Sequence, residues 1–557
     1  MSIRTENSSS ASGVLERSAV LDEAHLGDIT GALGTIARHD VAPRTHWWAR
    51  LRTLLAILGP GLIVMVGDND AGAFATYTQA GQNYGTTLLW TLLLLVPVLY
   101  VNQEMVLRLG AVSGVGHARL IFERFGRFWG AFSIIDLFLL NALTIVTEFI
   151  GITFVLDFFG FSRLAGVCIA AALTMAAVST GNFRRFERFA MVLCVLSLLL
   201  VPVLVSIHPP VGQMTRDLLV PGWPAHSKLS DVMLLVIGIV GTTVAPWQLF
   251  FQQSYVVDKR ITPRFIRYER ADLWIGIVFV MIGAIAMMAF CAELFAGKPE
   301  FGNFTDAGGV IAGLEKYAGW TMAALFAVAL FDAAIIGAAS VSLSTAYAIG
   351  DVFRIRHSLH RSVSAAKGFY LVYFGIVAGS AGLVLIPGSP LGLLTLAVQT
   401  LAGVLLPSAT VFLLLLCNDR EVLGPWANSQ RVNLFTGAVI WVLVMLSVIL
   451  TTSVMYPDMS GETILKVLAG GTVLAVVGYL VTVGIRRLHR EPKDAVGVAP
   501  RVYPEDARRW WRMPPLDELP PPRLTLARRI WMGVLRGYLL IAVALVIVKV
   551  AQLMFLK

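Results

Sequence analysis

The stretch that decides the fold is Gly59-Pro60-Gly61-Leu62-Ile63-Val64-Met65-Val66-Gly67-Asp68-Asn69-Asp70-Ala71-Gly72-Ala73-Phe74. It places glycines, a proline and two aspartates inside a run that is otherwise apolar enough for a membrane core. A second stretch, Gly238-Ile239-Val240-Gly241-Thr242-Thr243-Val244-Ala245-Pro246-Trp247-Gln248, has the same character. Backbone amides left unpaired in lipid are costly, so such helix breaks survive only where they line a cavity or a ligand. We therefore predict two discontinuous membrane helices with a binding site between them.

The composition of the whole chain indicates a polytopic membrane protein. Of its 557 residues 57% are hydrophobic and only 14% are charged, with a mean hydropathy of +0.74. Soluble domains carry about 25% charged residues, so this chain has too few charges to cover soluble domains. The four cysteines lie in or at the end of apolar blocks without CxxC spacing, which excludes a secreted disulfide scaffold.

Twelve apolar blocks are predicted to cross the membrane. They cover approximately residues 54–82, 86–107, 129–158, 164–180, 189–207, 231–257, 272–296, 319–349, 368–387, 391–417, 433–456 and 463–485. The two breaks fall in the first span of each five-span half, about 54–207 and 231–417, which is typical of an inverted repeat.

The two five-span halves form a core that we place at residues 51–420, and the remaining parts of the chain flank it. A polar tail (1–50) precedes it, and two additional membrane helices follow within 421–485. A Pro- and Arg-rich segment (486–537) includes Arg508 to Arg512, a run that suits a lipid headgroup or a soluble regulatory contact. The last apolar stretch (538–557) is a thirteenth span or an interfacial helix.

The basic residues predict the orientation. Alternate loops are rich in arginine and lysine: 119–127, 184–188, 259–270, 354–361 and 486–490. By the positive-inside rule these loops and the N-terminus are cytoplasmic, in a multi-pass protein of the cell membrane (an inner membrane). The tail lacks the basic and apolar regions of a signal peptide and is expected to be mobile. The net charge of +9 thus reflects topology; we expect no nucleic-acid partner and no obligatory protein partner.

At the two breaks the sequence resembles the NRAMP divalent-metal transporters, which have the LeuT-type fold. The family motif Asp-Pro-Gly-Asn, followed by Phe-Ala-Thr, corresponds to Asp70-Ala71-Gly72-Ala73-Phe74-Ala75-Thr76. Its Met-Pro-His corresponds to Ala245-Pro246-Trp247, and its tenth-span glutamine, eight residues before a proline, corresponds to Gln399. The resemblance covers about residues 54–420. It implies an all-α, five-plus-five inverted repeat that moves divalent metal ions.

The departures from the family pattern are informative. The family's metal-binding methionine is Ala245 here, and the histidine after the proline is Trp247. In the third span the family has an aspartate and a glutamate that serve the proton route; here the aspartate position is Ile145, while Glu148 is kept. This pattern resembles the NRAMP-related magnesium transporters.

The chemistry of the missing methionine favours a hard cation. A thioether binds softer transition-metal ions and offers Mg²⁺ almost nothing, whereas Mg²⁺ prefers oxygen ligands and keeps several waters. The hypothetical site combines the Asp70 carboxylate, carbonyls near Thr242 and Ala245, and waters, with Gln399 closing it. Asp68 and Asn69 are additional ligand candidates. Asp68 and Asp70 each have a second interpretation as the cap of the following half-helix.

Loss of the titratable groups at Ile145 and Trp247 predicts weak or no proton cotransport, with Glu148 as the one carboxylate left on that route. We therefore predict a uniporter-like Mg²⁺ transporter that also accepts Mn²⁺ and needs no cofactor. The alternative is a proton-coupled Mn²⁺ or Fe²⁺ symporter. A membrane enzyme is disfavoured because no HExxH or GxSxG motif occurs, and ATP driving because no P-loop motif occurs. A channel fits broken helices less well than a carrier.

Other polar residues of the spans have structural interpretations. Glu104 is expected to pair with a nearby arginine. Gln248 and Gln252, four residues apart, line the cavity entrance or bond a neighbouring helix. Asn141 and Asp332 are expected in packing networks, because charges and amides at this depth need partners.

Overall fold

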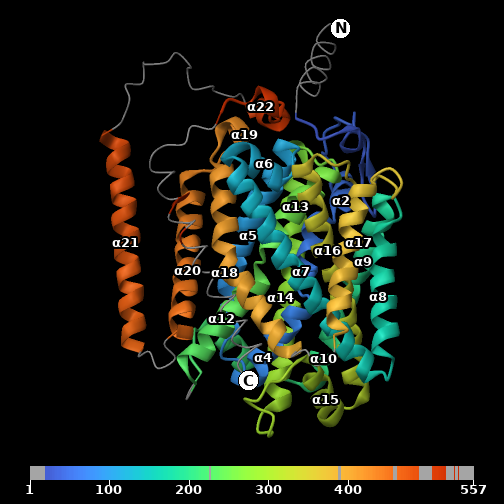
Figure 1. Ribbon diagram of the computed structural model, residues 1–557, viewed down its shortest axis with the longest axis vertical. Coiled ribbons are helices and arrows are strands. Elements are labelled where there is room, and N and C mark those ends of the chain that lie inside the picture. Colours follow the sequence, from blue (N-terminus) through green and yellow to red (C-terminus); the bar gives the residue numbers. More distant parts are fainter. Residues whose placement is uncertain are drawn as a thin grey trace.

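The computed structural model describes residues 19–224, 227–386, 391–455, 461–488 and 505–521, together with 532, 533 and 537. This part of the chain is a helical bundle with one short antiparallel sheet, β1 (Ile29–Thr30) paired with β2 (Thr35–Ile36). Most helices run along the long axis of the molecule (Figure 1). The all-α architecture agrees with the prediction.

The two halves of the bundle have the same order of elements. The first half contains α2 (Trp47–Ile57), α3 (Pro60–Val66), α4 (Ala71–Tyr84), α5 (Leu89–Ser113), α6 (His117–Phe125), α7 (Arg127–Phe158), α8 (Arg163–Val178), α9 (Phe183–Leu196), η2 (Ser197–Leu199) and α10 (Leu200–Ile207). After the linking helix α11 (Val211–Leu219), the second contains α12 (Leu229–Thr243), α13 (Pro246–Asp258), η3 (Pro263–Phe265), α14 (Ile266–Phe295), α15 (Ala307–Ala318), α16 (Trp320–Phe353), α17 (Lys367–Val384) and α18 (Leu391–Cys417).

Each half starts with a broken helix, and each has a short helix between its second and third spans. The short helices α6 and α15 lie at opposite ends of the bundle (Figure 1). The second half is therefore upside down relative to the first, which confirms the inverted repeat and the discontinuous first and sixth spans. The breaks lie at residues 67–70, between α3 and α4, and at 244–245, between α12 and α13.

A carboxylate from the other half fixes the start of α3. Asp272, in α14, accepts backbone hydrogen bonds from Gly59 (3.1 Å), Gly61 (2.6 Å) and Leu62 (3.2 Å). The first N–H groups of a helix have no intrahelical partner, and a negative charge there also interacts favourably with the helix dipole. Asp272 thereby joins α3 to α14 at one end of the bundle.

A helix lies in each of the twelve predicted blocks, but their lengths differ. Within the described residues nine helices are long and apolar enough to cross a membrane, and a tenth is formed if the pair α2 and α3, bent by 51°, counts as one span. Arg163–Val178 and Lys466–Gly478 are shorter apolar segments. The stretch 538–557, predicted as a thirteenth span or an interfacial helix, lies outside the described residues.

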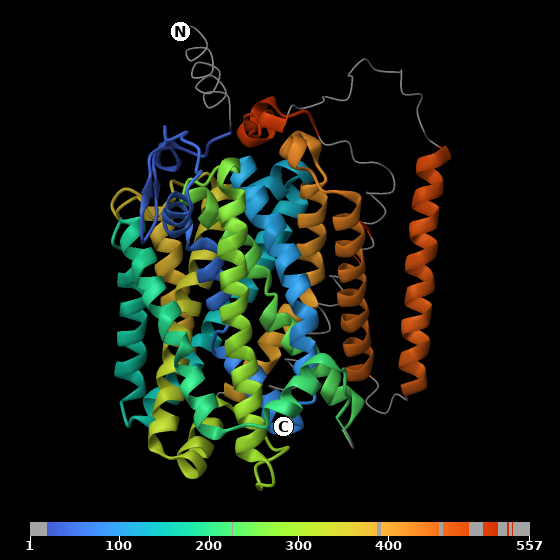
Figure 2. The ribbon, with the colours of Figure 1, turned by 180° about the vertical axis from the view of Figure 1, so that it is seen from behind.

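Two long helices, α20 (Gln430–Met455) and α21 (Gly461–Leu488), follow the core in the region where two additional membrane helices are predicted. The other elements after α18 are α19 (Arg420–Leu423), η4 (Gly424–Trp426), α22 (Glu505–Trp510) and η5 (Leu516–Glu518). Helix α20 packs on α18 and α12, whereas α21 stands outermost, beyond α20 (Figures 1 and 2).

The prediction of a mobile tail is wrong from residue 19 onward. Ala19, Ile29 and Ile36 are buried, and the segment 19–46 adds the short helix η1 (Glu23–His25) to the two strands. Arg184 and Arg188 of α9 donate to the carbonyls of Gly31 and Ala32, each at 3.1 Å. These bonds satisfy backbone carbonyls of a segment whose composition alone suggests a mobile tail.

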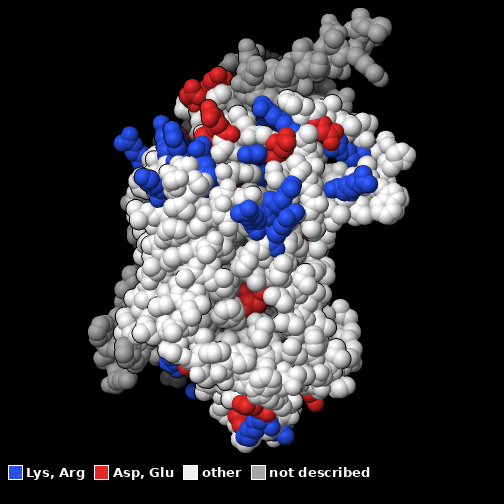
Figure 3. All heavy atoms as spheres, turned by 90° about the vertical axis from the view of Figure 1, so that its right-hand side faces the viewer, with Lys and Arg blue, Asp and Glu red and all other residues white. Residues whose placement is uncertain are grey.

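The C-terminal segment 505–521 also packs on the protein. Met513 is fully buried; its N–H donates to Val112 O and its carbonyl accepts from Ala19 N. This segment, α6 and the β1–β2 sheet share one end of the bundle (Figures 1 and 2). Lysine and arginine side chains gather there above a band of mostly uncharged residues (Figure 3). We call it the basic end.

Candidate metal-binding site at the two helix breaks

The first break holds three buried polar residues, Asp68, Asn69 and Asp70, exposed by 1%, 4% and 3%. Asp70 Oδ1 accepts the N–H of Ala73 at 2.8 Å and is the N-cap of α4. The alternative that Asp68 caps this half-helix is therefore wrong. A carboxylate has about four lone-pair positions, so one capping bond leaves Asp70 able to bind a cation.

Glu148 lies beside Asp70 at the same helix terminus. Its Oε2 accepts the N–H of Ala71 at 3.0 Å, and the two carboxyl groups are close enough to interact. A methyl group at Gly337 of α16 would lie 2.8 Å from the Glu148 carboxyl carbon. Helix α16 therefore closes directly over this carboxylate, which is fully buried.

Gln399 of α18 reaches the first turn of α4. A methyl group at Gly72 would lie 1.6 Å from Gln399 Nε2 and 3.1 Å from Asp70 Oδ1. The absence of a side chain at Gly72 lets the Gln399 amide sit against α4, next to Asp70. Gln399 Nε2 is buried without a protein partner. The structure thus brings Gln399 and Asp70 together, as expected for a residue that closes the site.

Asp68 is linked to the second broken helix. Gln248 of α13 donates from Nε2 to Asp68 Oδ1, and its Oε1 accepts from Gln103 Nε2 of α5 at 2.8 Å. Asp68 Oδ2 is buried without a partner. Of the two interpretations of Gln248, the bond to a neighbouring element is the one found, whereas both amide atoms of Gln252 are buried without a hydrogen bond.

Asn69 points toward α14 rather than along the break. Its Nδ2 donates to Val280 O at 3.1 Å, and its Oδ1 is buried without a partner. Asn69 therefore anchors the unwound segment to α14, as Asp68 links it to α13.

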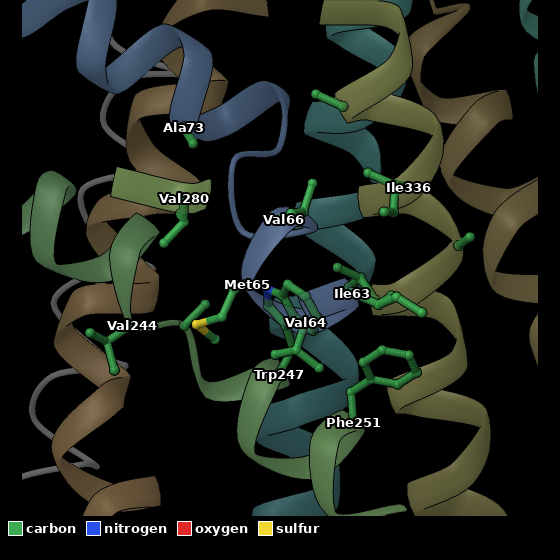
Figure 4. Packing of buried hydrophobic residues seen from close by; sticks show 14 of the residues in the cluster. Ile63, Val64, Met65, Val66, Ala73, Val244, Trp247, Phe251, Val280 and Ile336 are labelled. Atoms are coloured by element: carbon green, nitrogen blue, oxygen red, sulfur yellow. The ribbon is translucent and has the colours of Figure 1, made fainter. Parts of the chain in front are cut away.

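The second break offers small and polar groups. Ala245 is the extended N-cap residue of α13, with Pro246 at the first helical position, and its side chain is a single methyl group. Thr242 Oγ1 is buried without a partner. Trp247 belongs to the same buried hydrophobic cluster as Val64 and Met65 of α3 (Figure 4), and a methyl group at Gly67 would lie 3.6 Å from its Cη2.

Several buried oxygens around the breaks are left unsatisfied by the protein. They are Asp68 Oδ2, Asn69 Oδ1, Glu148 Oε1 and Thr242 Oγ1. Buried oxygens are costly unless a hydrogen bond or a cation completes them. Across the described residues no group of three or more His, Cys, Asp or Glu side chains converges as a metal cluster. Beyond the carboxylates of Asp68 and Asp70, a cation here would depend on amide, hydroxyl and carbonyl oxygens and on water.

The positions expected on a proton route differ in character. Ile145, one helical turn before Glu148, is fully buried and has no titratable group. Trp247 Nε1 has no partner, while its carbonyl accepts from Ser344 Oγ at 2.9 Å. Of these three positions, only Glu148 carries a group that ionises.

The structure agrees with the predictions for two of the other polar residues of the spans and contradicts the third. Glu104 pairs with Arg270 (2.6 Å) and Arg108 (3.2 Å), which confirms the prediction. Asn141 donates to Thr345 Oγ1 at 2.8 Å in the expected packing network. For Asp332 that expectation is wrong, because both its oxygens are buried without a hydrogen bond to any residue that the structure describes.

Two residues near the site escaped the sequence analysis. Gln103 completes the amide chain to Asp68, and Asp136 of α7 lines a hollow of about 10 Å³ beside Pro246 and Ser408. A carboxylate inside the block 129–158 was the available signal for Asp136, since charges within spans are functional candidates. Gln103 gave no such signal, because an isolated glutamine in a span does not reveal its partner.

Two broken helices of opposite orientation, meeting at polar residues inside a bundle, define a transporter of the LeuT type. Residues 61–453 match the family described as natural resistance-associated macrophage protein-like. The chain therefore belongs to the Nramp family, and it is a transporter rather than an enzyme.

Individual relatives agree with this assignment. The chain is 28% identical to the divalent metal cation transporter MntH of Ralstonia nicotianae over 423 residues, which cover 72% of this chain and 90% of that protein. It is 27% identical to MntH of Xylella fastidiosa over 464 residues, 80% of this chain and 93% of that one. The manganese transporter of Eremococcus coleocola, solved with an aromatic bis-isothiourea substituted compound, has a TM-score of 0.60 at 20% identity, covering 81% of this chain and 99% of that one.

Proposed function

We propose that this protein moves divalent metal ions across the membrane, prefers Mg²⁺, also accepts Mn²⁺, and does so without coupled proton transport. The ion is the transported substrate, held between the two breaks by Asp70 with Thr242, the Ala245 backbone and Gln399. Asp68 and Asn69 would bind its water shell. Nramp membership and the divalent-metal names of the relatives support metal transport.

One observation supports the preference for Mg²⁺: the available donors at the breaks are oxygens, and the side chain of Ala245 is a methyl group. Mg²⁺ takes oxygen ligands and keeps several waters, and a site without a thioether loses its advantage for softer ions. Met65, at the end of α3, packs its side chain against Gly276 of α14.

The absence of proton coupling is supported by the same region. A relay needs titratable groups in sequence, and Ile145 and Trp247 offer none. Glu148 is engaged by the backbone N–H of Ala71, a structural task that accounts for a carboxylate here. The competing function, a proton-coupled Mn²⁺ or Fe²⁺ symporter, requires Glu148 to exchange protons during transport.

We further propose that the basic end faces the cytoplasm. Lysine and arginine gather at that end (Figure 3), in agreement with the positive-inside rule. The half-helices α3 and α13 run from the breaks toward this end, so their movement would open the site to the cytoplasm, while α4 and α12 run toward the opposite side.

Uptake into proteoliposomes tests the proposal. Mg²⁺, Mn²⁺ and Ca²⁺ are compared in parallel with internal pH recorded in the same vesicles, and Asp70→Asn serves as the site control. Saturable Mg²⁺ entry without acidification, lost in Asp70→Asn, supports the proposal. Mn²⁺ entry that acidifies the vesicles, with no Mg²⁺ entry, would establish the symporter instead.

A further inference from the structure

A hollow at the basic end lies between three segments that are far apart in the sequence. It has a volume of about 80 Å³, several times the roughly 10–15 Å³ that one ordered water needs. Arg38 comes from the N-terminal segment, Arg260 and Arg264 from the connection after α13, and Arg509 and Arg512 from the C-terminal segment. Five arginine residues thus line one small cavity.

Three of these arginines have no carboxylate partner among the residues that the structure describes. Elsewhere at the basic end Arg44 pairs with Asp40 at 2.7 Å and Arg124 with Asp419 at 2.6 Å. Within the described residues Arg38, Arg509 and Arg512 form no ion pair. The hollow therefore carries positive charge that this part of the protein does not neutralise.

The other two arginines are held in place by neutral groups. Arg260 donates to the carbonyls of Ala24 and Asp28 at 2.8 to 3.1 Å. Arg264 donates to the Asp40 carbonyl at 3.0 Å and lies 4.6 Å over the Trp510 ring. Such contacts fix the guanidinium groups and leave their charge available.

The electrostatics of the hollow agree with unneutralised charge. Burial, together with the nearby Arg38, lowers the pKa of Arg512 to about 10. Burial and the charges of Arg44 and Arg509 also lower the pKa of Arg264. Burial also lowers the pKa of Arg260, against the opposing charges of Asp258 and Asp28.

The wall of the hollow also contains an unsatisfied hydroxyl. Thr262 Oγ1 is buried and has no hydrogen-bond partner in the described part of the chain. A buried hydroxyl without a partner is costly, and here it borders a cavity surrounded by guanidinium groups. An oxyanion placed in the hollow would accept from the hydroxyl and from the arginines at once.

We propose that this hollow is a binding site for a phosphate-bearing anion, either a free phosphate compound or the headgroup of an anionic lipid. Arginine forks match the oxygens of a phosphate in paired, charge-assisted hydrogen bonds. The bound anion joins the N-terminal segment, the end of α13 and the C-terminal segment around one neutralising charge. This inference is independent of which metal ion the protein transports.

The test measures ligand binding by the purified full-length protein in detergent, without transported metal. Potassium pyrophosphate is one probe; dioctanoyl phosphatidylglycerol, compared with dioctanoyl phosphatidylcholine, is the other. A ligand that binds the folded state raises the melting temperature in a concentration-dependent way, and the shift should shrink at high ionic strength. Potassium chloride at matched ionic strength is the blank.

The pocket variant is Arg38→Gln/Arg509→Gln/Arg512→Gln. Its matched control, Arg185→Gln/Arg267→Gln/Arg356→Gln, removes the same charge from exposed arginines of the basic end. Thr262→Val tests the hydroxyl with all arginines kept. We expect the pocket variant to weaken the affinity for the effective probe at least about tenfold, Thr262→Val to weaken it less, and the control to leave it unchanged.

The outcomes distinguish a free phosphate compound from a lipid headgroup as the natural ligand. Stabilisation by pyrophosphate assigns the site to a free phosphate compound, and stabilisation by phosphatidylglycerol alone assigns it to a lipid headgroup. The proposal fails if neither probe stabilises the parent protein. It also fails if the pocket and control variants lose affinity equally, because the attraction would then belong to the whole basic end.

Discussion

Glu148 Oε2 accepts the backbone N–H of Ala71 at 3.0 Å, and Ala71 directly follows Asp70. The carboxylate of α7 therefore holds the first turn of α4, which Asp70 itself caps through Ala73. Two carboxylates share one helix N-terminus, where the N–H groups and the helix dipole favour negative charge. This arrangement ties the geometry of Asp70 to α7.

Replacing Glu148 separates its structural role from proton transfer. Glu148→Gln keeps an acceptor for Ala71 N–H but removes the ionisable group, so we expect metal uptake to be retained. Glu148→Ala leaves that buried N–H unpaired and should cost about 1–3 kcal/mol of stability. Thermal unfolding and vesicle uptake measure the two effects. Lost uptake in a Glu148→Gln protein of normal stability would instead place Glu148 in the transport cycle.

The contact between Gly72 and Gln399 gives a second prediction. The added methyl of Gly72→Ala would lie 1.6 Å from Gln399 Nε2, so the amide must move away from Asp70. We expect uptake to fall about tenfold, the equivalent of about 1.4 kcal/mol at the binding step. The control is Gly375→Ala in α17, where the added methyl meets nothing within 4 Å.

A double variant distinguishes a lost ligand from a simple clash. Gly72→Ala/Gln399→Ala removes the clashing amide, so the melting temperature should recover toward that of the parent. Uptake should stay low, because the residue that closes the site is absent. Recovery of both quantities would show that Gln399 has no part in transport.

Ala245 is the residue through which selectivity can be changed. Ala245→Met introduces a thioether at the second break, and we expect Mg²⁺ uptake to fall about tenfold while Mn²⁺ and Cd²⁺ uptake is kept or rises. Ala245→Leu adds a side chain of similar size without sulfur and should reduce uptake of all three ions. Uptake ratios in competition measure the change. Undiminished Mg²⁺ uptake by Ala245→Met would refute our account of selectivity.

The breaks could be predicted from the sequence because their cause is local. Gly67 to Asp70 and Ala245-Pro246 interrupt apolar runs with residues that cannot continue a helix in lipid, and the structure breaks both helices there. The pairing of Gln399 with the first break came from its family motif. These features needed no knowledge of which side chains meet.

The contacts that hold the breaks could not be predicted in this way. Glu148 and Ala71 are 77 residues apart, and Gln103 and Gln248 are 145 apart. A single sequence shows that such side chains need partners but not which ones they find. The prediction of a mobile N-terminal tail failed for a similar reason. The arginines that bind Gly31 and Ala32 lie on α9, about 150 residues further along the chain.

A buried ion pair at the basic end gives a prediction about stability. Lys259 Nζ lies 2.6 Å from Glu187 Oε1 and 2.6 Å from Ile57 O, and both side chains are fully buried. Lys259→Met leaves the Glu187 carboxylate without its cation, and removing one partner of a buried pair costs about 3–5 kcal/mol. Thermal unfolding should show a large decrease in melting temperature.

Two further variants check this reasoning. Lys259→Met/Glu187→Gln removes both charges and should recover part of the lost stability. Lys316→Met breaks the exposed pair with Glu300 and should leave the melting temperature nearly unchanged. If Lys259→Met were as mild as Lys316→Met, the buried pair would not be what secures α2, α9 and the end of α13 to one another.

The buried side chain of His117 leads us to predict that the folded protein loses stability at acidic pH. It lies at the start of α6, fully buried, with Nδ1 2.8 Å from Gln253 Oε1. Burial lowers its pKa to about 4, although Gln253 and the charge of Asp351 act in the opposite direction. Between this value and about 6.5, the ordinary pKa of histidine, the unfolded chain binds a proton that the folded protein does not. Stability from this group is therefore present above pH 6.5 and is lost as the pH falls.

The size of the effect follows from linkage. Lowering the pH from 7 to 5 should remove about 2 kcal/mol through His117 alone. His117→Gln should reduce the acid-induced decrease in melting temperature, whereas His39→Gln, at an exposed histidine, should not. The pKa of His357 is raised by Asp351 against the effect of its burial, so His357 contributes to the pH dependence of stability with the opposite sign. Because both variants keep His357, the comparison between them isolates His117. Equal acid sensitivity of both variants would mean that His117 is protonated without cost in the folded protein.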